Sequence, residues 1–93
     1  MRAIHPGEIL QEEIEALGYS ANRFAQALCV PANRITAILK GQRSITADTA
    51  LRLAKFFDMT PEFWLNLQIA FDLKVTKKIS GKRINDEVVR PTM

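Results

Sequence analysis

Side chains that could bind nucleic-acid bases gather in one short stretch of the 93-residue sequence, PANRITAILKGQR (Pro31–Arg43). Asn33 can form paired hydrogen bonds with adenine, and Arg34 can form them with guanine. Thr36 and Ala37 are small enough for a helix to approach base edges, and their methyl groups can contact that of thymine. The candidates for base contact are Ala32, Asn33, Arg34, Thr36 and Ala37. An ordinary solvated helix has a similar polar face, so the stretch alone does not decide between the two interpretations.

Donors and cations on either side of this stretch fit phosphates better than bases. Three of them begin a short helix whose free backbone amides also favour an anion, and three lie around the end of the next helix. The candidates for phosphate contact are Ser20, Asn22, Arg23, Lys40, Gln42 and Arg43. Phosphate contacts set the affinity and its salt dependence, whereas base contacts set the sequence specificity.

Residues arranged for catalysis or metal binding are not recognisable. The chain has one His and one Cys, which excludes an internal disulfide and a multi-cysteine metal site. His5 precedes Pro6 and is expected either to cap a helix or to be a packing residue, and Cys29 is expected to be a small apolar residue in a turn. Paired carboxylates, metal-ligand spacing and a phosphate-binding glycine loop are missing. We therefore expect no enzymatic activity, no metal and no cofactor.

The size and charge pattern fit one small domain with an anionic partner. The composition lacks a long apolar run or a leader-like segment, so we expect a soluble, cytoplasmic protein with no membrane association. Residues 1–17 carry one basic and four acidic side chains, whereas residues 18–58 carry six basic and two acidic ones. The basic middle is compatible with nucleic acid. The acidic side chains Glu12, Glu13 and Glu15 are expected to be a solvated helix face, with contact to a basic protein as the alternative.

Apolar residues recur at spacings of three and four, which predicts an all-α chain of five helices. Pro6 and Gly18 mark the start and end of the first helix, and Ser20 is expected to cap the second. The expected inward residues include Leu17 in the first helix, Ile35 and Ile38 in the third, and Leu51 in the fourth. The predicted helices are Pro6–Leu17, a second from Ser20, a third over Pro31–Lys40 ending at Gly41, a fourth capped by Thr46, and a fifth over about 61–77.

Two short helices joined by a tight turn, over about residues 20–40, match a helix-turn-helix, in which the second helix enters the DNA major groove. The domain is expected to span residues 5–78. From Ser80 the composition turns polar and basic, with Gly81 as a helix breaker, so residues 79–93 are predicted to be a flexible basic tail.

The fifth helix is apolar nearly all round, so it must be covered on two sides. One side can pack on the domain, and the other is the candidate homodimer face. A dimer formed there would place two recognition helices about 34 Å apart, which suits successive major grooves. The alternative is that the basic tail folds back over this face. The candidate dimer residues are Leu65, Ile69, Ala70 and Leu73.

Four segments resemble the HigA (VapI-like) antitoxins, which lie within the wider Xre or Cro/CI helix-turn-helix family. They are HPGEIL (5–10), NRFAQAL (22–28), VPANRITAILKGQRSITADTALRLAKFF (30–57) and TPEFWLNLQIAFDL (60–73). The resemblance implies a lambda-repressor-like fold and a dimeric antitoxin. Such an antitoxin would neutralise a HigB-like mRNA interferase toxin and repress its own operon by binding operator DNA.

The resemblance also assigns roles to residues. Its recognition helix falls on Pro31–Lys40, which implies a groove-facing role for Ala32, Asn33, Arg34, Thr36, Ala37 and Lys40. Cys29 stands where many relatives have Gly, which leaves the geometry of the turn open. Two other functions remain as alternatives: a stand-alone Xre-family repressor without a toxin, and a helical protein-binding module that does not bind DNA.

Overall fold

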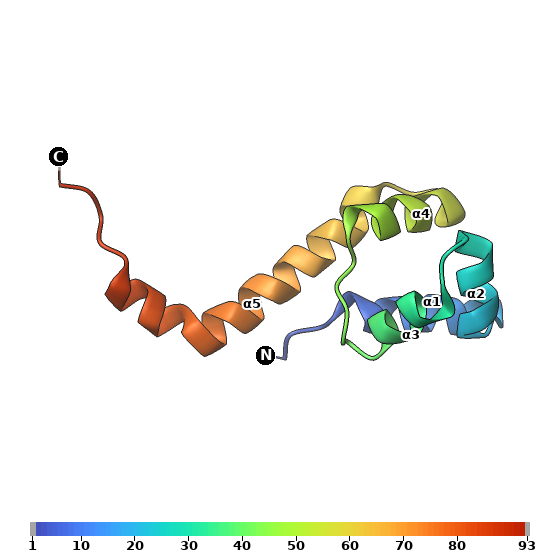
Figure 1. Ribbon diagram of the computed structural model, residues 1–93, viewed down its shortest axis with the longest axis horizontal. Helices are drawn as coiled ribbons and strands as arrows, with labels where there is room; N and C mark the ends of the chain where they lie inside the picture. Colours follow the sequence, from blue (N-terminus) through green and yellow to red (C-terminus); the bar gives the residue numbers. More distant parts are fainter. Residues whose placement is uncertain (1, 93) are drawn as a thin grey trace.

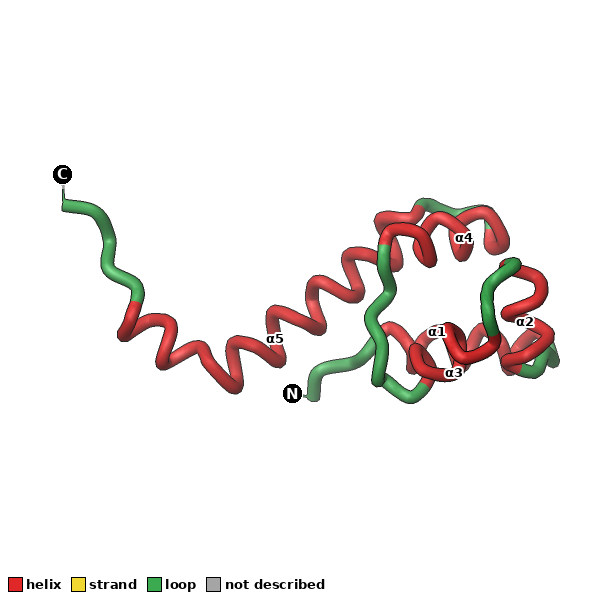
Figure 2. The backbone as a smooth tube through the Cα atoms, in the orientation of Figure 1, coloured by secondary structure: helices red, strands yellow, loops and turns green. Residues whose placement is uncertain are grey.

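The computed structural model describes residues 2–92, and within this range the chain is all-α (Figures 1 and 2). The predicted fold class and the number of helices are confirmed. Helices α1 to α4 and the first part of α5 form a body, from which the rest of α5 projects (Figure 1). The helices are α1 (Pro6–Leu17), α2 (Ala21–Leu28), α3 (Ala32–Leu39), α4 (Ala47–Phe57) and α5 (Pro61–Glu87).

Most helices begin where the sequence supplies a cap. His5 Nδ1 accepts a hydrogen bond from the Gly7 amide at 2.9 Å, and the Glu8 carboxylate accepts one from the His5 amide at 3.1 Å. This reciprocal pair satisfies two amides at the start of α1. The predicted caps at Ser20 and Thr46 are also confirmed, because each hydroxyl accepts an amide of the following turn. Helix α3 differs slightly, because Pro31 stands just before it rather than in its first turn.

The core lies between α1, α2, α3, α4 and the first turns of α5. Helix α1 contributes Leu10 and Ile14, and the aromatic ring of Phe24 packs edge-on to that of Phe56 at 5.1 Å. The fully buried large apolar side chains include Leu10, Ile14, Phe24, Ile35, Ile38, Leu53 and Trp64.

Two residues predicted to point inward do not. Leu51 is 60% exposed, because the buried row of α4 runs through Ala50, Leu53 and Ala54, and Leu51 lies one step around the helix from it. Leu17 is 44% exposed in the last turn of α1, next to the left-handed Gly18 where the chain leaves the helix.

Helix α1 approaches α3 closely at Gly7. A Cβ atom placed on Gly7 would overlap the carbonyl oxygen of Ile38 in α3. Only glycine allows this approach of two backbones. The small residue therefore sets the position of the C-terminal end of α3 against the body.

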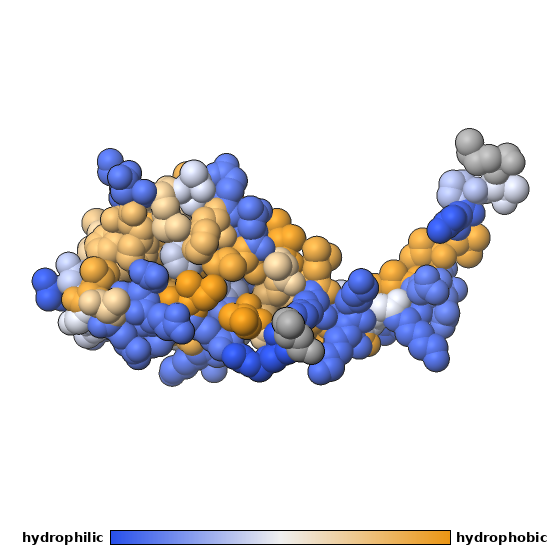
Figure 3. Space-filling view, turned by 180° about the vertical axis from the view of Figure 1, so that it is seen from behind, coloured by the Kyte–Doolittle hydropathy of each residue, from blue (hydrophilic) through white to orange (hydrophobic). Residues whose placement is uncertain are grey.

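The predicted end of the fifth helix near residue 77 is wrong, because α5 continues to Glu87. The predicted tail is therefore helical over 79–87, and within the described part of the tail only residues 88–92 lack regular structure. Gly81 is accommodated inside the helix, where Lys and Arg neighbours are good helix formers and Arg83 lies 3.8 Å from Glu87 one turn later. Figure 3 shows hydrophilic and hydrophobic atoms side by side along this projecting segment. No helix within residues 2–92 combines the length and apolar character that a membrane span requires.

Candidate nucleic-acid interface

The turn between α2 and α3 has helix-turn-helix geometry. Cys29 ends α2 in the left-handed conformation, with φ 58° and ψ 46°. The Val30 amide then donates to the carbonyl oxygen of Ala25 at 3.0 Å, and Pro31 leads in extended conformation into α3. Cys29 therefore adopts the backbone conformation usually given to Gly at a helix C-terminus. For a non-glycine residue this conformation costs about 1–2 kcal/mol.

Helix α3 presents the predicted small and polar face outward. Ile35 and Ile38 are fully buried, which fixes the rotation of the helix on the body. Asn33 is exposed near its N-terminal end. Thr36 and Ala37 are half-buried, and the Thr36 hydroxyl donates to the carbonyl oxygen of Asn33 at 3.4 Å. The face is thus low in its middle, which lets the helix backbone approach a flat or grooved partner.

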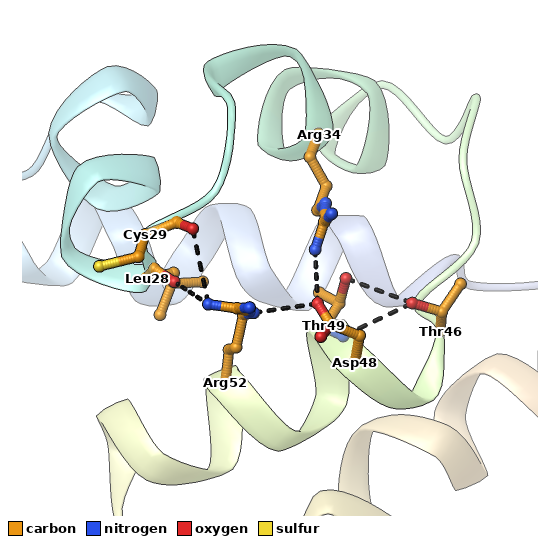
Figure 4. Close-up of polar contacts among 7 residues, drawn as sticks. All are labelled: Leu28, Cys29, Arg34, Thr46, Asp48, Thr49 and Arg52. Atoms are coloured by element: carbon orange, nitrogen blue, oxygen red, sulfur yellow. Dashed lines mark hydrogen bonds and ion pairs between the residues drawn. The ribbon is translucent and has the colours of Figure 1, made fainter.

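Arg34 does not stand free on this face. Its guanidinium donates to the Asp48 carboxylate at 2.6 Å, and its side chain is only 25% exposed (Figure 4). Asp48 also accepts from Arg52 at 2.9 Å, and Arg52 reaches back to the carbonyl oxygen of Leu28 at 2.9 Å. The network ties the N-terminal half of α3 and the end of α2 to helix α4.

Asp48 and Arg52 are functional candidates that the reading of the sequence missed. Their spacing of four residues on one helix is the signal that could have indicated a pair, but nothing in the sequence indicates that the pair faces Arg34. The guanidinium groups of Arg52 and then Arg34 hold the pKa of the Asp48 carboxyl below its ordinary value. Asp48 therefore stays ionised, and the network keeps its charge, across the neutral range.

The candidates for phosphate contact lie at two places. Asn22 and Arg23 are exposed in the first turn of α2. The Ser20 hydroxyl there accepts a hydrogen bond from the Arg23 amide. The Arg23 guanidinium lies 4.1 Å from the centre of the Tyr19 ring. The second group is exposed after α3 and consists of Lys40, Gln42 and Arg43. Gly41, left-handed with φ 73°, turns the chain between them. The first group stands at the start of α2 and the second follows α3, so they mark the two ends of the helix-turn-helix along the sequence.

The candidate dimer residues are divided by the structure. Ile69 is 54% exposed and Leu73 is 66% exposed, and Ala70 is exposed beside them. Leu65 is half-buried and packs against the core. The outer stripe of α5 is therefore narrower than predicted at its N-terminal end.

Gln68 is a further residue that the sequence did not indicate. It is polar but only 5% exposed, because it lies one turn after the buried Trp64 on the same side of α5. Its side-chain oxygen accepts from the Ile45 amide at 2.8 Å, and its nitrogen donates to the Asp72 carboxylate at 2.9 Å. Gln68 thereby anchors α5 to the loop that follows α3.

Comparison with known proteins agrees with this geometry. A helix-turn-helix family model matches residues 10–65. Virulence-associated protein I of Dichelobacter nodosus is 52% identical over 79 residues, which are 84% of this chain and 73% of that protein.

Solved structures of HigA proteins have the same fold over nearly the whole chain. An addiction module antidote protein of the HigA family from Coxiella burnetii is 64% identical, with a TM-score of 0.92, covering 98% of this chain and 100% of that one. Pseudomonas aeruginosa antitoxin HigA, solved with the higBA promoter, is 40% identical, with a TM-score of 0.91, covering 99% and 100%. The chain therefore belongs to the HigA family of helix-turn-helix antitoxins, which are regulators and not enzymes.

Proposed function

We propose that this chain is a homodimeric antitoxin that binds operator DNA, represses the operon encoding it and neutralises a HigB-like mRNA interferase. One observation carries the DNA part of the proposal: the outward face of α3 is low in its middle and has exposed donors at its ends. The burial of Ile35 and Ile38 holds α3 in this orientation. A relative with the same fold over 99% of this chain has been solved with its promoter. That likeness supports the same mode of docking here.

In this mode α3 enters the major groove. Asn33 forms the principal base contact, and Ala32, Thr36 and Ala37 approach base edges. Arg34 joins the base contacts only after it exchanges the Asp48 carboxylate for a base edge, so it ranks second to Asn33.

Phosphates are bound on both sides of this groove. One stretch of DNA backbone is faced by Ser20, Asn22 and Arg23. The other is faced by the residues after α3, which are Lys40, Gln42 and Arg43. Ser20 contributes its position at the helix N-terminus more than its hydroxyl, which the Arg23 amide already occupies.

The dimer is formed along the exposed stripe of α5. Ile69, Ala70 and Leu73 form its centre, and Leu65 contributes its exposed edge. Burying this stripe against a second copy removes apolar surface from water, which stabilises the dimer by roughly 25 cal/mol for each Å² buried. A two-fold axis through it presents two copies of α3 to successive major grooves, about 34 Å apart.

A gel-shift assay on the promoter fragment upstream of this gene tests the DNA part. Asn33→Ala should reduce discrimination at one base pair, by about 1–3 kcal/mol, while leaving binding to unrelated DNA unchanged. Arg43→Ala should weaken binding to all sequences and reduce the salt slope by about 1. Arg90→Ala, which removes the same charge beyond the end of α5, is the matched control and should change neither quantity.

Equal effects of Asn33→Ala and Arg43→Ala on every sequence would contradict the division between base and phosphate contacts. Retention of full promoter binding by a double Asn33→Ala, Arg43→Ala variant would reject DNA binding through α3 altogether. The protein would then be better described as a protein-binding module.

Co-expression with the adjacent reading frame tests the antitoxin part. The product of that frame should arrest growth by itself, and this chain should restore growth and copurify with it. If the chain binds the promoter but neither restores growth nor forms a complex with that product, it is a stand-alone repressor.

A further inference from the structure

A second surface lies between α1, the end of α4 with the loop that follows it, and the first turns of α5. It is a cleft of about 240 Å³ lined by Ile9, Glu13, Phe57, Met59, Phe63 and Trp64. None of these residues belongs to α2 or α3. We call it the acidic cleft.

The cleft combines an apolar floor with the carboxylate of Glu13, and three further acidic residues lie on the elements that form it. Glu12 and Glu13 are exposed on α1, and Asp58 and Glu62 are exposed at the end of α4 and the start of α5. Among the ion pairs of residues 2–92, none includes these four carboxylates. By contrast, the Glu8 and Asp48 carboxylates each have arginine partners within 2.9 Å.

Two aromatic residues of the cleft lack part of their usual surroundings: Phe63 is partly exposed to water, and Trp64 lacks a hydrogen-bond acceptor within residues 2–92. Phe63 is 42% exposed and stands edge-on to Trp64, with 5.2 Å between the ring centres. The indole Nε1 of Trp64 is buried with no acceptor among the described residues. A buried donor without an acceptor costs roughly 1–3 kcal/mol. An apolar side chain bound beside Phe63 would cover the exposed part of its ring.

We propose that the acidic cleft is the docking surface for the toxin, which binds it through a cationic patch bearing one apolar side chain. This inference rests on the proposed function, because the occupant is the mRNA interferase named there. A ribonuclease must attract a polyanion, so its surface carries an excess of Lys and Arg. Such a surface is complementary to Glu13 in the cleft and to the three other carboxylates on the same elements, and the apolar floor provides the anchor that central interface residues require.

A second copy of this chain is the competing occupant. A basic groove lined by Arg2, Ala3, Lys74, Val75, Lys77, Lys78 and Ile79 runs along α5 and is opposite in charge to the acidic cleft. Dimer contacts and toxin contacts must therefore be measured separately.

Trp64 is the only tryptophan of the chain and lines the cleft, so it reports occupancy directly. The full chain is labelled with 5-fluorotryptophan and titrated with the purified product of the adjacent reading frame, followed by ¹⁹F NMR and calorimetry. Toxin binding should shift the single resonance, and operator DNA alone should not.

The discriminating variant is Glu12→Lys, Glu13→Lys, matched by Asp86→Lys, Glu87→Lys at the far end of α5. The first should weaken toxin binding at least about tenfold, and the second by less than about twofold. Phe63→Ala, at an exposed position, should also cost about tenfold by removing the apolar contact.

The outcomes separate this inference from the function on which it rests. Unchanged toxin affinity in both cleft variants would overturn the docking surface and leave the antitoxin function standing. Failure of the wild-type chain to bind the toxin would overturn both. A cleft variant that sediments as a monomer while binding toxin normally would assign the cleft to a second copy and overturn the proposal.

Discussion

In the proximal half of α5 (residues 61–72) Trp64 is 1% exposed and Gln68 is 5% exposed, whereas in the distal half (residues 73–87) Ile79 is 77% exposed and Ile84 is 43% exposed. The backbone is helical through both halves. The proximal half is held by the core and by the bond from Gln68 to the Ile45 amide. The distal half buries no residue in the body.

This difference shows that one helix can have two sources of order. Packing fixes the proximal half, and a helix that is already nucleated can be extended at little cost per residue. The distal half depends on that extension, on local propensity and on weak pairs such as Arg83 with Glu87. Stability should therefore be high in the body and low along the distal half, as separate unfolding units.

The largest effect should come from adding one methyl group where α1 meets α3. Gly7→Ala places a Cβ atom on the carbonyl oxygen of Ile38, so the two helices must separate. We expect a loss of about 3 kcal/mol in the free energy of unfolding, measured by urea denaturation. Promoter affinity should fall with it, because α3 shifts. An unchanged urea midpoint would show that the body is not the rigid unit described here.

A smaller loss should follow from removing the polar anchor of the proximal half. Gln68→Ala leaves the buried Ile45 amide without its acceptor, which should cost about 2 kcal/mol. Exchange of the Ile45 amide hydrogen, followed by NMR, should accelerate in parallel. Asn66→Ala, exposed on the same half, is the control and should stay within about 0.5 kcal/mol. If the two variants unfold alike, then packing rather than Gln68 anchors α5.

The features that could be predicted from the sequence are those set by local chemistry. The caps at Ser20 and Thr46 and the burial of Ile35 and Ile38 follow from residue type and helical period, and each is confirmed. Gln68 could not be predicted, because its burial depends on an amide from a distant loop rather than on its own polarity.

The pair of Arg34 with Asp48 and the length of α5 were missed for related reasons. The pair requires the placement of α3 against α4, which no local pattern encodes. The helix continues past Gly81 because its preceding turns are already formed, whereas composition alone marks the segment as a tail.

The pH dependence of the unfolding free energy tests the body separately from the distal half, because the only His of the chain lies in the body. Burial lowers the pKa of His5 below its ordinary value of 6.5, although the nearby Asp72 and Glu8 carboxylates oppose this shift. The unfolded chain then binds the proton more readily, so stability should fall as pH drops below 6.5.

The control for this titration is His5→Asn, which keeps a capping side chain but does not titrate. Its unfolding free energy should stay flat between pH 6.5 and 5, where the wild type declines. The Glu8 and Asp48 carboxyls have lowered pKa values, so their contributions are lost only as pH falls below their ordinary values of 4.5 and 3.8. A wild-type curve that is flat down to pH 5 would contradict the assignment to His5.

The smallest effect should come from the same Gly-to-Ala change made in the distal half. Gly81→Ala should stabilise the local helix by about 1 kcal/mol, because Ala restricts the unfolded backbone and the new Cβ meets only the flexible Lys77 side chain, at 3.3 Å. If the distal half unfolds independently, the gain appears as stronger helical circular dichroism and slower amide exchange near residue 81. The urea midpoint of the body then stays where it was. A midpoint that rises with the local gain would mean that both halves of α5 unfold together, because only a shared transition can carry stabilisation from an exposed turn into the core.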